Sequence, residues 1–385
     1  MTPSRSLSTK LSDPQRTSLH RSFEQLCRIE SPTYQERACA DWLIAELSAI
    51  GLAVHEDGAG ESVGSTAGNL LARIPAHASQ TTILLCAHLD TVPPTAPVEP
   101  LHSEGGWTNV NPAILGADNK AAVAAILEAA RILVLATPPL GPRAGVEILF
   151  TIAEETGLHG AEAFDLSELQ SSYGYVFDHA SPLGEIITAS PTHMSIQAEI
   201  TGRAAHAGLE PELGVNAIVA LAKAVVQLPQ GRYDEETTAN IGTISGGTAE
   251  NVVADSCRLE AEIRSASPER LDELLRGAVD AIEEAADSSG CNAQITVQKM
   301  FSGYRVAPSE ASLKNAERAL LRIGYQPRHR FSGGGSDANA LRAKGFQCTN
   351  LANGTEYAHQ RTERVSDQAL EANLELILAL VEAAS

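Results

Sequence analysis

The chain has 385 residues, of which 43% are hydrophobic and 20% charged, and this composition excludes global disorder. Because 385 residues exceed the usual size of a single hydrophobic core, we expect two domains. The formal net charge of −20 would repel a phosphate backbone, and no window approaches the roughly 18 to 20 uninterrupted apolar residues of a membrane helix, so we expect neither nucleic acid nor a membrane as a partner.

The N-terminal part of the chain predicts two helices after a polar start. The opening Met1-Thr-Pro-Ser-Arg-Ser lacks the apolar core of a signal peptide, so we expect a cytoplasmic protein. Over residues 14–50 apolar side chains recur at helical spacing, with one interruption at Ser31-Pro32-Thr33. The six cysteines show no CxxC or regular spacing, which indicates reduced thiols rather than a disulfide framework.

The following part of the chain alternates between strands and helices. Apolar runs at 70–74, 82–87, 146–153 and 173–177 predict strands, and the Ala-rich segment 119–135 predicts a helix. Such alternation is typical of an α/β fold, in which a largely parallel sheet has helices on both faces.

A second pattern interrupts the α/β pattern in the middle of the chain. The order of predicted elements there is βαββαβ, which is the ferredoxin-like α+β signature. These elements are a strand at 194–200, a helix at 213–228, strands at 239–244 and 252–263, a helix at 268–286 and a strand at 293–297. The α/β pattern resumes with a helix at 310–323. We therefore expect a catalytic domain formed by residues 1–192 and 301–385, with an inserted domain at 193–300.

Histidine and acidic residues lie at or just past the carboxyl ends of the predicted strands. His88 follows one strand, and Glu154, Glu155 and Asp178 end or follow the next two. In α/β enzymes the functional groups gather at this edge of the sheet. Two further candidates come from outside the strands, one before the Ala-rich helix and one near the C-terminus. The candidate metal ligands are His88, Asp118, Glu155, Asp178 and His359.

This ligand set predicts a site for two metal ions. Imidazole and carboxylate ligands without thiolate suit Zn²⁺, with Mn²⁺ or Co²⁺ as substitutes. We assign Asp118 as the carboxylate that bridges both ions, His88 and Asp178 to one ion, and Glu155 and His359 to the other. Three protein ligands for each ion leave room for a water between them, whose pKa falls toward about 7.

Two more carboxylates have predicted roles beside the ions. Glu154 is free to take a proton from the bridging water and hand it to the leaving amine. Asp90 stands two residues after His88, where a carboxylate can fix the position and tautomer of a metal-bound imidazole.

Each of these residues also has an ordinary structural explanation. Asp118 could cap the helix that follows it, and the adjacent Glu154 and Glu155 could belong to a solvated loop. Cys86 points to the same strand face as His88, but thiolates suit closed structural zinc sites better than open hydrolytic ones. The order of the motifs on successive strands favours the metal site.

From His88 to His359 the motifs resemble the dinuclear zinc exopeptidase family of peptidase T (tripeptide aminopeptidase), aminoacylase, carboxypeptidase G, succinyl-diaminopimelate desuccinylase and dipeptidase V. The resemblance covers most of the chain and is closest to the peptidase T branch. The run Phe331-Ser-Gly-Gly-Gly-Ser-Asp337, the ending Asn353-Gly-Thr-Glu-Tyr-Ala-His359, and aspartate at 178 carry it. Ser336 stands where the family usually has Thr or Leu, which leaves the substrate open.

The resemblance implies a zinc exopeptidase-like catalytic domain and a lid domain that also forms homodimers. It implies that Asp90 orients His88 and that Glu154 is the general base. His206, in Gly202-Arg-Ala-Ala-His206, resembles a lid histidine that reaches the scissile carbonyl, sometimes across a dimer. Asn251 and Arg264 resemble lid residues that hold the substrate.

The run Gly333-Gly-Gly335 has two interpretations. A phosphate-binding loop would need a following Lys-Ser or Lys-Thr, which is absent from the sequence. We expect instead that the backbone around Gly334 lies beside the substrate, because glycine lets a ligand approach closely.

The leading functional hypothesis is an aminopeptidase that acts on short peptides. The alternatives within enzymes are an N-acyl amino acid amidohydrolase and a carboxypeptidase. A metal-dependent binding protein without catalysis is a third hypothesis, against which Glu154 argues because a binder needs no base beside its metals.

Overall fold

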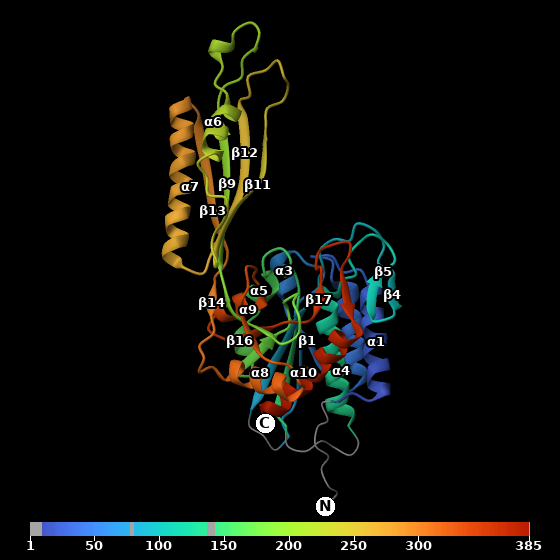
Figure 1. Cartoon of the computed structure of the whole chain (residues 1–385). Helices are drawn as coiled ribbons and strands as arrows, with labels where there is room; N and C mark the ends of the chain where they lie inside the picture. The colour runs from blue at the N-terminus through green and yellow to red at the C-terminus, as the bar shows by residue number, and fades with distance from the viewer. Residues whose placement is uncertain (1–9, 78–80, 137–142, 385) are drawn as a thin grey trace, which may run out of the picture. The chain divides into compact units, whose positions relative to one another are not determined.

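The computed structural model describes residues 10–77, 81–136 and 143–384, which fall into two units (Figure 1). Unit 1 comprises Met1–Thr188, Arg305–Arg330 and Ser336–Ser385, and unit 2 comprises Ala189–Tyr304 and Phe331–Gly335. The sequence analysis expects boundaries after residues 192 and 300. The structure has them after 188 and 304, and it also assigns Phe331–Gly335 to unit 2. Residues 1–9, on which the expectation about a signal peptide rests, lie outside the described part.

The sheet of unit 1 is parallel at its centre and antiparallel at its sides. Its strand order is β1-β2-β6-β3-β7-β16-β8-β14, with β15 also paired to β8. The four central strands β6, β3, β7 and β16 are parallel, and β1, β2 and β8 pair antiparallel. The strands are β1 (Val54–Glu56), β2 (Leu70–Ile74), β3 (Thr82–His88), β6 (Gly145–Thr151), β7 (Tyr173–Val176), β8 (Glu185–Ser190), β14 (Tyr304–Arg305), β15 (Arg328–Phe331) and β16 (Gln347–Leu351).

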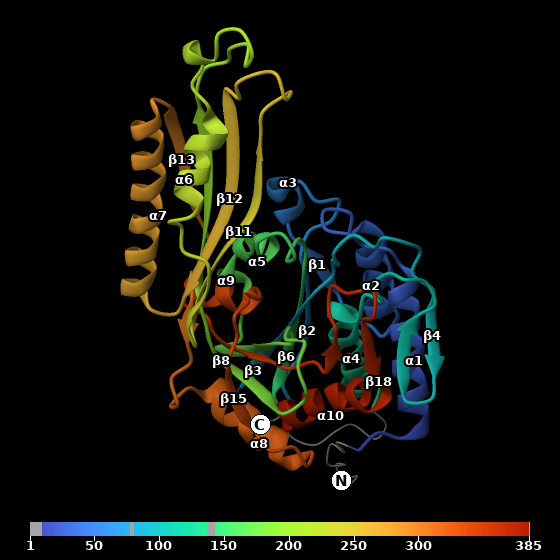
Figure 2. The ribbon, with the colours of Figure 1, turned by 45° about the horizontal axis from the view of Figure 1, so that its top comes forward.

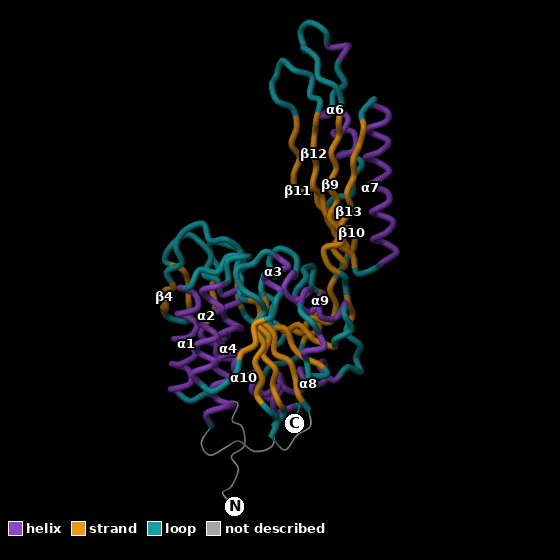
Figure 3. Tube along the Cα trace, turned by 180° about the vertical axis from the view of Figure 1, so that it is seen from behind, coloured by secondary structure: helices purple, strands orange, loops and turns teal. Residues whose placement is uncertain are grey.

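Helices cover this sheet, and α4 (Ala117–Leu135) packs directly on β2 and β3. The helix is rich in alanine and almost wholly buried, so small side chains allow its close approach to the strands. Figure 3 shows α1 and α2 gathered beside α4. The remaining bounds are α1 (Asp13–Arg28), α2 (Arg37–Ala49), α3 (Ala59–Val63), α5 (His159–Ala163), α8 (Ala311–Arg322), α9 (Asp337–Ala343) and α10 (Asp367–Ala383).

Unit 1 also contains a small second sheet, in two segments for which the sequence pattern predicts no strand. Its strand order is β17-β18-β5-β4. Its strands are β4 (Pro100–Ser103), β5 (Gly106–Asn109), β17 (Thr355–Glu356) and β18 (Arg364–Ser366). The short strands carry too few alternating apolar residues to be recognised from the sequence.

Unit 2 is an antiparallel sheet of order β10-β11-β12-β9-β13 with two helices on one face (Figure 2). Chain order is β9 (Thr192–Thr201), α6 (Ala217–Val225), β10 (Gly231–Asp234), β11 (Thr237–Gly246), β12 (Ser256–Ser265), α7 (Pro268–Ser289) and β13 (Asn292–Phe301). This is the predicted βαββαβ order with the short strand β10 added. The predicted fold class, an α/β catalytic domain with an inserted ferredoxin-like domain, is confirmed.

Within the described residues, no helix combines the length and apolar character that crossing a bilayer requires. All six cysteines are buried and free of disulfides, as the sequence predicts.

Candidate active site

The central parallel strands deliver the candidate residues to one edge of the unit 1 sheet. His88 is the last residue of β3, and Asp178 lies two residues beyond the end of β7. Glu154 and Glu155 follow β6, which ends at Thr151. Because these strands are parallel, their carboxyl ends meet, and so do the side chains that follow them.

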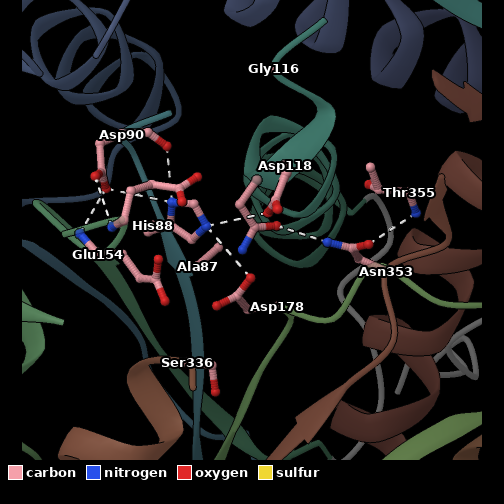
Figure 4. A network of polar contacts seen from close by, with 12 residues as sticks. Ala87, His88, Asp90, Gly116, Asp118, Glu154, Asp178, Ser336, Asn353 and Thr355 are labelled. Atoms are coloured by element: carbon pink, nitrogen blue, oxygen red, sulfur yellow. Dashed lines mark hydrogen bonds and ion pairs between the residues drawn. The ribbon is translucent and has the colours of Figure 1, made fainter. Parts of the chain in front are cut away.

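The candidate ligands form two adjacent groups of three. His88, Glu154 and Asp178 make up the first group, and Asp118, Glu155 and His359 make up the second. Within each group the possible ligand atoms lie within 4.8 Å of one another. Asp118 faces both groups. Its Oδ1 is 3.4 Å from His88 Nε2 (Figure 4), and its Oδ2 is 3.5 Å from His359 Nε2.

The spacing of these atoms suits divalent cations. Two ligand atoms bound to one tetrahedral zinc at about 2.0–2.2 Å stand roughly 3.4 Å apart. The distance from His88 Nε2 to Asp178 Oδ1 is 3.6 Å, and His359 Nε2 lies 3.0 Å from Glu155 Oε2. Asp118 Oδ1 is buried and accepts no hydrogen bond. A buried acceptor opposite an imidazole nitrogen fits a cation between them, so the residues present fit a two-metal site.

The electrostatics of the site also favour bound cations. Asp118 and Glu155 raise the pKa of His359 to about 10. Burial opposes a charge on His88, but Asp178 and Asp118 still hold the pKa of this imidazole well above its ordinary value. The carboxylates therefore demand positive charge, which two divalent ions would supply in place of the two protons.

Glu154 is a buried carboxyl among other carboxylates. Burial first, and the nearby charge of Asp178 second, raise its pKa well above the ordinary value. A carboxyl with a raised pKa holds a proton more readily than an ordinary carboxylate, which suits a group that must take up a proton and pass it on.

Asp90 contacts both His88 and the Glu154–Glu155 turn. His88 Nδ1 lies 2.9 Å from the main-chain oxygen of Asp90 and 3.5 Å from its carboxylate oxygen Oδ1. The carboxylate itself accepts hydrogen bonds from the main-chain N–H groups of Glu154 (3.0 Å) and Glu155 (3.2 Å). Asp90 thus holds the imidazole mainly through its backbone and the glutamate turn through its side chain.

Three further buried side chains hold the backbone of the site, and sequence reasoning missed them. Asn350 donates to Asp178 O (2.9 Å) and accepts from Asp178 N (3.0 Å). Glu36 accepts from the main-chain N–H of Ala153, a non-glycine residue with φ 49°. Glu363 accepts from the turn that carries Asp118. The only sequence signal for them is a polar residue close to apolar neighbours, which many residues share.

A third group of possible ligands, His20, His102 and Asp367, lies elsewhere in unit 1. His20 Nδ1 accepts a hydrogen bond from Trp107 Nε1 at 2.9 Å, so its lone pair is already used. His102 stacks on Trp107 and lies 2.8 Å from Asp367. These contacts attach the β4–β5 hairpin to α1 and α10, and we assign no metal to them.

Cys86 does not belong to any of these groups among the described residues. Its thiol is fully buried and points to Asp337 Oδ2 at 4.0 Å.

The four predicted substrate residues all lie in unit 2, in two separate places. His206 and Asn251 are neighbours, because Ala207 N donates to Asn251 O at 2.9 Å. Arg264 donates to Gly333 O at 3.3 Å, next to Gly334. Arg264 pairs with His193 at one end of β12, whereas Ser256 pairs with Thr201 at the other end, near His206 and Asn251. At about 3.3 Å per residue the two places are roughly 26 Å or more apart.

Comparisons with known proteins identify the family. A peptidase dimerisation domain model matches residues 188–289, and a peptidase family M28 model matches residues 69–195, which include β3, β6 and β7. The structure of aminopeptidase PepT from Bacillus cereus matches with a TM-score of 0.86 and 36% identity, covering 96% of this chain and 98% of that one. A tripeptidase structure from Staphylococcus aureus gives 0.90 and 33%, covering 95% and 98%.

Among sequences, a "Probable carboxypeptidase" from Paracoccidioides brasiliensis is 31% identical over 319 residues, which are 76% of this chain and 68% of that protein. Identity at this level over most of the chain, with the dimerisation domain in the expected place, confirms the resemblance that the motifs indicate. The chain belongs to the M20 family of metallopeptidases, the family of peptidase T.

Proposed function

We propose that this enzyme is a dinuclear zinc aminopeptidase that cleaves tripeptides and other short peptides. The observation that carries the proposal is Asp118, whose two carboxylate oxygens face two groups of ligands, with the buried carboxyl of Glu154 beside them. The similarity to PepT and to a tripeptidase supports the substrate class. His88 and Asp178 would hold one ion, Glu155 and His359 the other, and Asp118 both.

When bound, the two cations lower the pKa of a water and polarise the peptide carbonyl. Glu154 would take one proton from the attacking water as the water oxygen bonds to the peptide carbonyl carbon. It would pass this proton to the nitrogen of the departing amine as the C–N bond breaks. Asp90 keeps Glu154 in place through its main-chain N–H, so the proton acceptor does not have to reorganise during the reaction.

The alternative is a carboxypeptidase or an N-acyl amino acid amidohydrolase. The fungal relative named as a carboxypeptidase favours this reading, and so does Arg264, because a guanidinium suits capture of a terminal carboxylate. The proposed function and the alternative differ in whether the substrate must have a free amino end or may have a blocked one.

A substrate panel separates these functions. The zinc-loaded enzyme is assayed with a free-amine tripeptide, with its N-acetylated form, and with N-acetyl amino acids, while zinc content is measured in parallel. The proposal expects two zinc ions and turnover of the free-amine tripeptide alone. Turnover of only the blocked substrates would overturn it in favour of the alternative. Two zinc ions without any turnover would favour a binding protein.

We also propose that unit 2 is the lid and mediates a homodimer, as the match to a dimerisation domain supports. In unit 2, which is described in full, residues 240–246 of β11 have no strand partner on their outer side. Exposed apolar side chains lie on α6 (Ile218 and Val219) and on β11 (Ile244). An unpaired edge beside apolar side chains is suited to pairing with a second copy. Light scattering of Ile244→Lys tests this: a dimer in the unaltered protein and a monomer in the variant are expected.

A dimer would allow the two separated sets of lid residues to act in the same active site. One lid cannot present both His206 and Arg264 to a tripeptide, because their places lie roughly 26 Å or more apart. We propose that Arg264, with the backbone at Gly334, serves its own subunit, whereas His206 and Asn251 serve the partner's site. Mixing inactive His206→Ala and Glu154→Gln dimers would then restore about a quarter of the wild-type activity, because half the dimers are mixed and carry one intact site. No recovery in exchanged dimers would contradict it.

For location we propose the cytoplasm. Six buried cysteines without disulfides are typical of a reducing compartment, and the strong negative charge gives no attraction to nucleic acid or to acidic membranes. Fractionation of cells that express the chain, followed by immunoblotting, tests this location.

A further inference from the structure

Glu363 is a buried carboxylate that accepts three hydrogen bonds from one turn of the backbone. Its Oε2 accepts from Leu115 N at 2.7 Å and from Gly116 N at 2.8 Å, and its Oε1 accepts from Asp118 N at 2.8 Å. The residue is only 2% exposed. We propose that Glu363 is a positioning residue that fixes Asp118 between the two ligand groups and thereby sets the affinity of the second metal ion.

The turn before α4 needs such a partner. Gly116 has a left-handed φ of 79°, and Asp118 lies outside the helical region at φ −82° and ψ 103°. The N–H groups of Leu115 and Gly116 precede α4, and that of Asp118 lies in its first turn, so none of them has a partner within the helix. Glu363 accepts from all three, and both oxygens of Asp118 face the histidines.

Glu363 also links two members of the second group, Asp118 and His359. It lies four residues after His359, and the segment between them is a tight turn with Gln360 N bonded to Tyr357 O and Glu363 N bonded to Gln360 O, both at 3.0 Å. His359 itself has a left-handed φ of 64°. One short segment therefore carries His359, which is a ligand of the second group, and Glu363, whose side chain holds the turn of Asp118.

The first group is held by other residues. Asn350 holds the backbone of Asp178, and Asp90 holds that of Glu154. Asp118 faces both groups, but only the second group also contains His359, which lies on the segment that carries Glu363. Loss of Glu363 should therefore weaken the second ion more than the first. Partners of this kind are worth about 10- to 100-fold in metal affinity.

Glutamine is an informative replacement because it has the same shape but only one acceptor oxygen. In Glu363→Gln the amide NH₂ must face either Asp118 N or the pair of Leu115 N and Gly116 N, so donor opposes donor in either orientation. The turn must shift to relieve this contact, and Asp118 shifts with it.

The chain offers a matched control at the opposite end of the same sheet. Glu147, near the start of β6, is also buried (1% exposed) and also accepts main-chain hydrogen bonds, from Gln170 N and Ser171 N. Glu147→Gln creates the same kind of donor conflict far from the ligands. A general loss of stability would appear in both variants, whereas a positioning effect on the metals would appear in Glu363→Gln alone.

The inference rests on the proposed two-metal site, and zinc titration of the full-length protein tests both separately. Apo-protein is titrated with zinc in a buffered series, and bound zinc is counted after equilibrium dialysis. We expect two ions in the unaltered protein and in Glu147→Gln. In Glu363→Gln we expect a second ion that binds about 10- to 100-fold more weakly and a first ion that is weakened less.

Two outcomes would overturn the inference: unchanged affinity for both ions in Glu363→Gln, or equal weakening in Glu147→Gln. Fewer than two ions in the unaltered protein would instead overturn the proposed function. If Glu363→Gln does not fold, Glu363→Asp carries the test, because it keeps both acceptor oxygens and shortens the reach by one methylene. It should again weaken the second ion more than the first.

Discussion

The two ligand groups of the metal site are built in different ways. In the first, His88 ends a central strand and its side chain is 1% exposed. In the second, His359 lies on a loop in a left-handed conformation, and its side chain is 51% exposed. The strands β3, β6 and β7 lead into the first group, and buried hydrogen bonds then hold its backbone, whereas Asp118 and His359 of the second group lie in turns. We therefore expect the first ion to bind more tightly and to exchange more slowly than the second.

The largest expected effect concerns Glu154, which lies among the ligand atoms of the first group. If it is the general base, Glu154→Gln should lower kcat by about 10²- to 10⁴-fold and retain two zinc ions. Steady-state kinetics with a tripeptide, together with zinc content, measure this effect. Loss of the first ion in this variant would show instead that Glu154 is a metal ligand. The ligand set of the first ion would then have to be redefined.

The second prediction compares the two histidines directly. His359→Ala should leave one tightly bound zinc, whereas His88→Ala should lose the tight ion and keep only weak binding. Because ligands are removed, each loss should exceed the roughly 10- to 100-fold cost of removing an outer partner. Stepwise removal of zinc by increasing chelator, followed by metal analysis, measures the order. Equal affinities in the two variants would remove the distinction between the groups.

The third prediction concerns Asn350, which does for Asp178 what Glu363 does for Asp118. Asn350→Ala removes both hydrogen bonds to the Asp178 backbone and leaves buried polar groups unpaired, which costs about 1–3 kcal/mol of unfolding free energy. The first ion should bind about 10- to 100-fold more weakly and the second should be little affected. Urea unfolding of the apo-protein and the zinc titration measure the two effects.

The difference between the groups also explains how much could be predicted from the sequence. Strand periodicity marks where β3, β6 and β7 end, so His88, the glutamate pair and Asp178 are found from local pattern. His359 has no such pattern around it, so residue type alone makes it a candidate, and the family resemblance then supports it. Glu36 and Glu363 have none either, because their partners are main-chain N–H groups 117 and about 245 residues away. In unit 2, likewise, periodicity predicts the long strands β9, β11, β12 and β13 but not the short strand β10.

The smallest expected effect comes from a histidine–carboxylate contact in unit 2, where no metal group is formed by the described residues. His193, at 3.1 Å, and Arg264, at 2.9 Å, lower the pKa of Glu262 from 4.5 to about 2. Because the folded-state pKa is lowered, the stabilisation is present above pH 4.5 and is lost as the pH falls toward 2.

The Glu262 side chain is 34% exposed, so solvent screening limits this stabilisation to about 1 kcal/mol at pH 7. Urea unfolding of the unaltered protein and of Glu262→Gln should therefore differ by that amount at pH 7, and the difference should shrink as the pH falls below 4.5. Added zinc should not change the difference between the two proteins. A zinc-dependent difference would place a metal at Glu262 and would show that the two groups in unit 1 are not the only histidine–carboxylate sites that bind one.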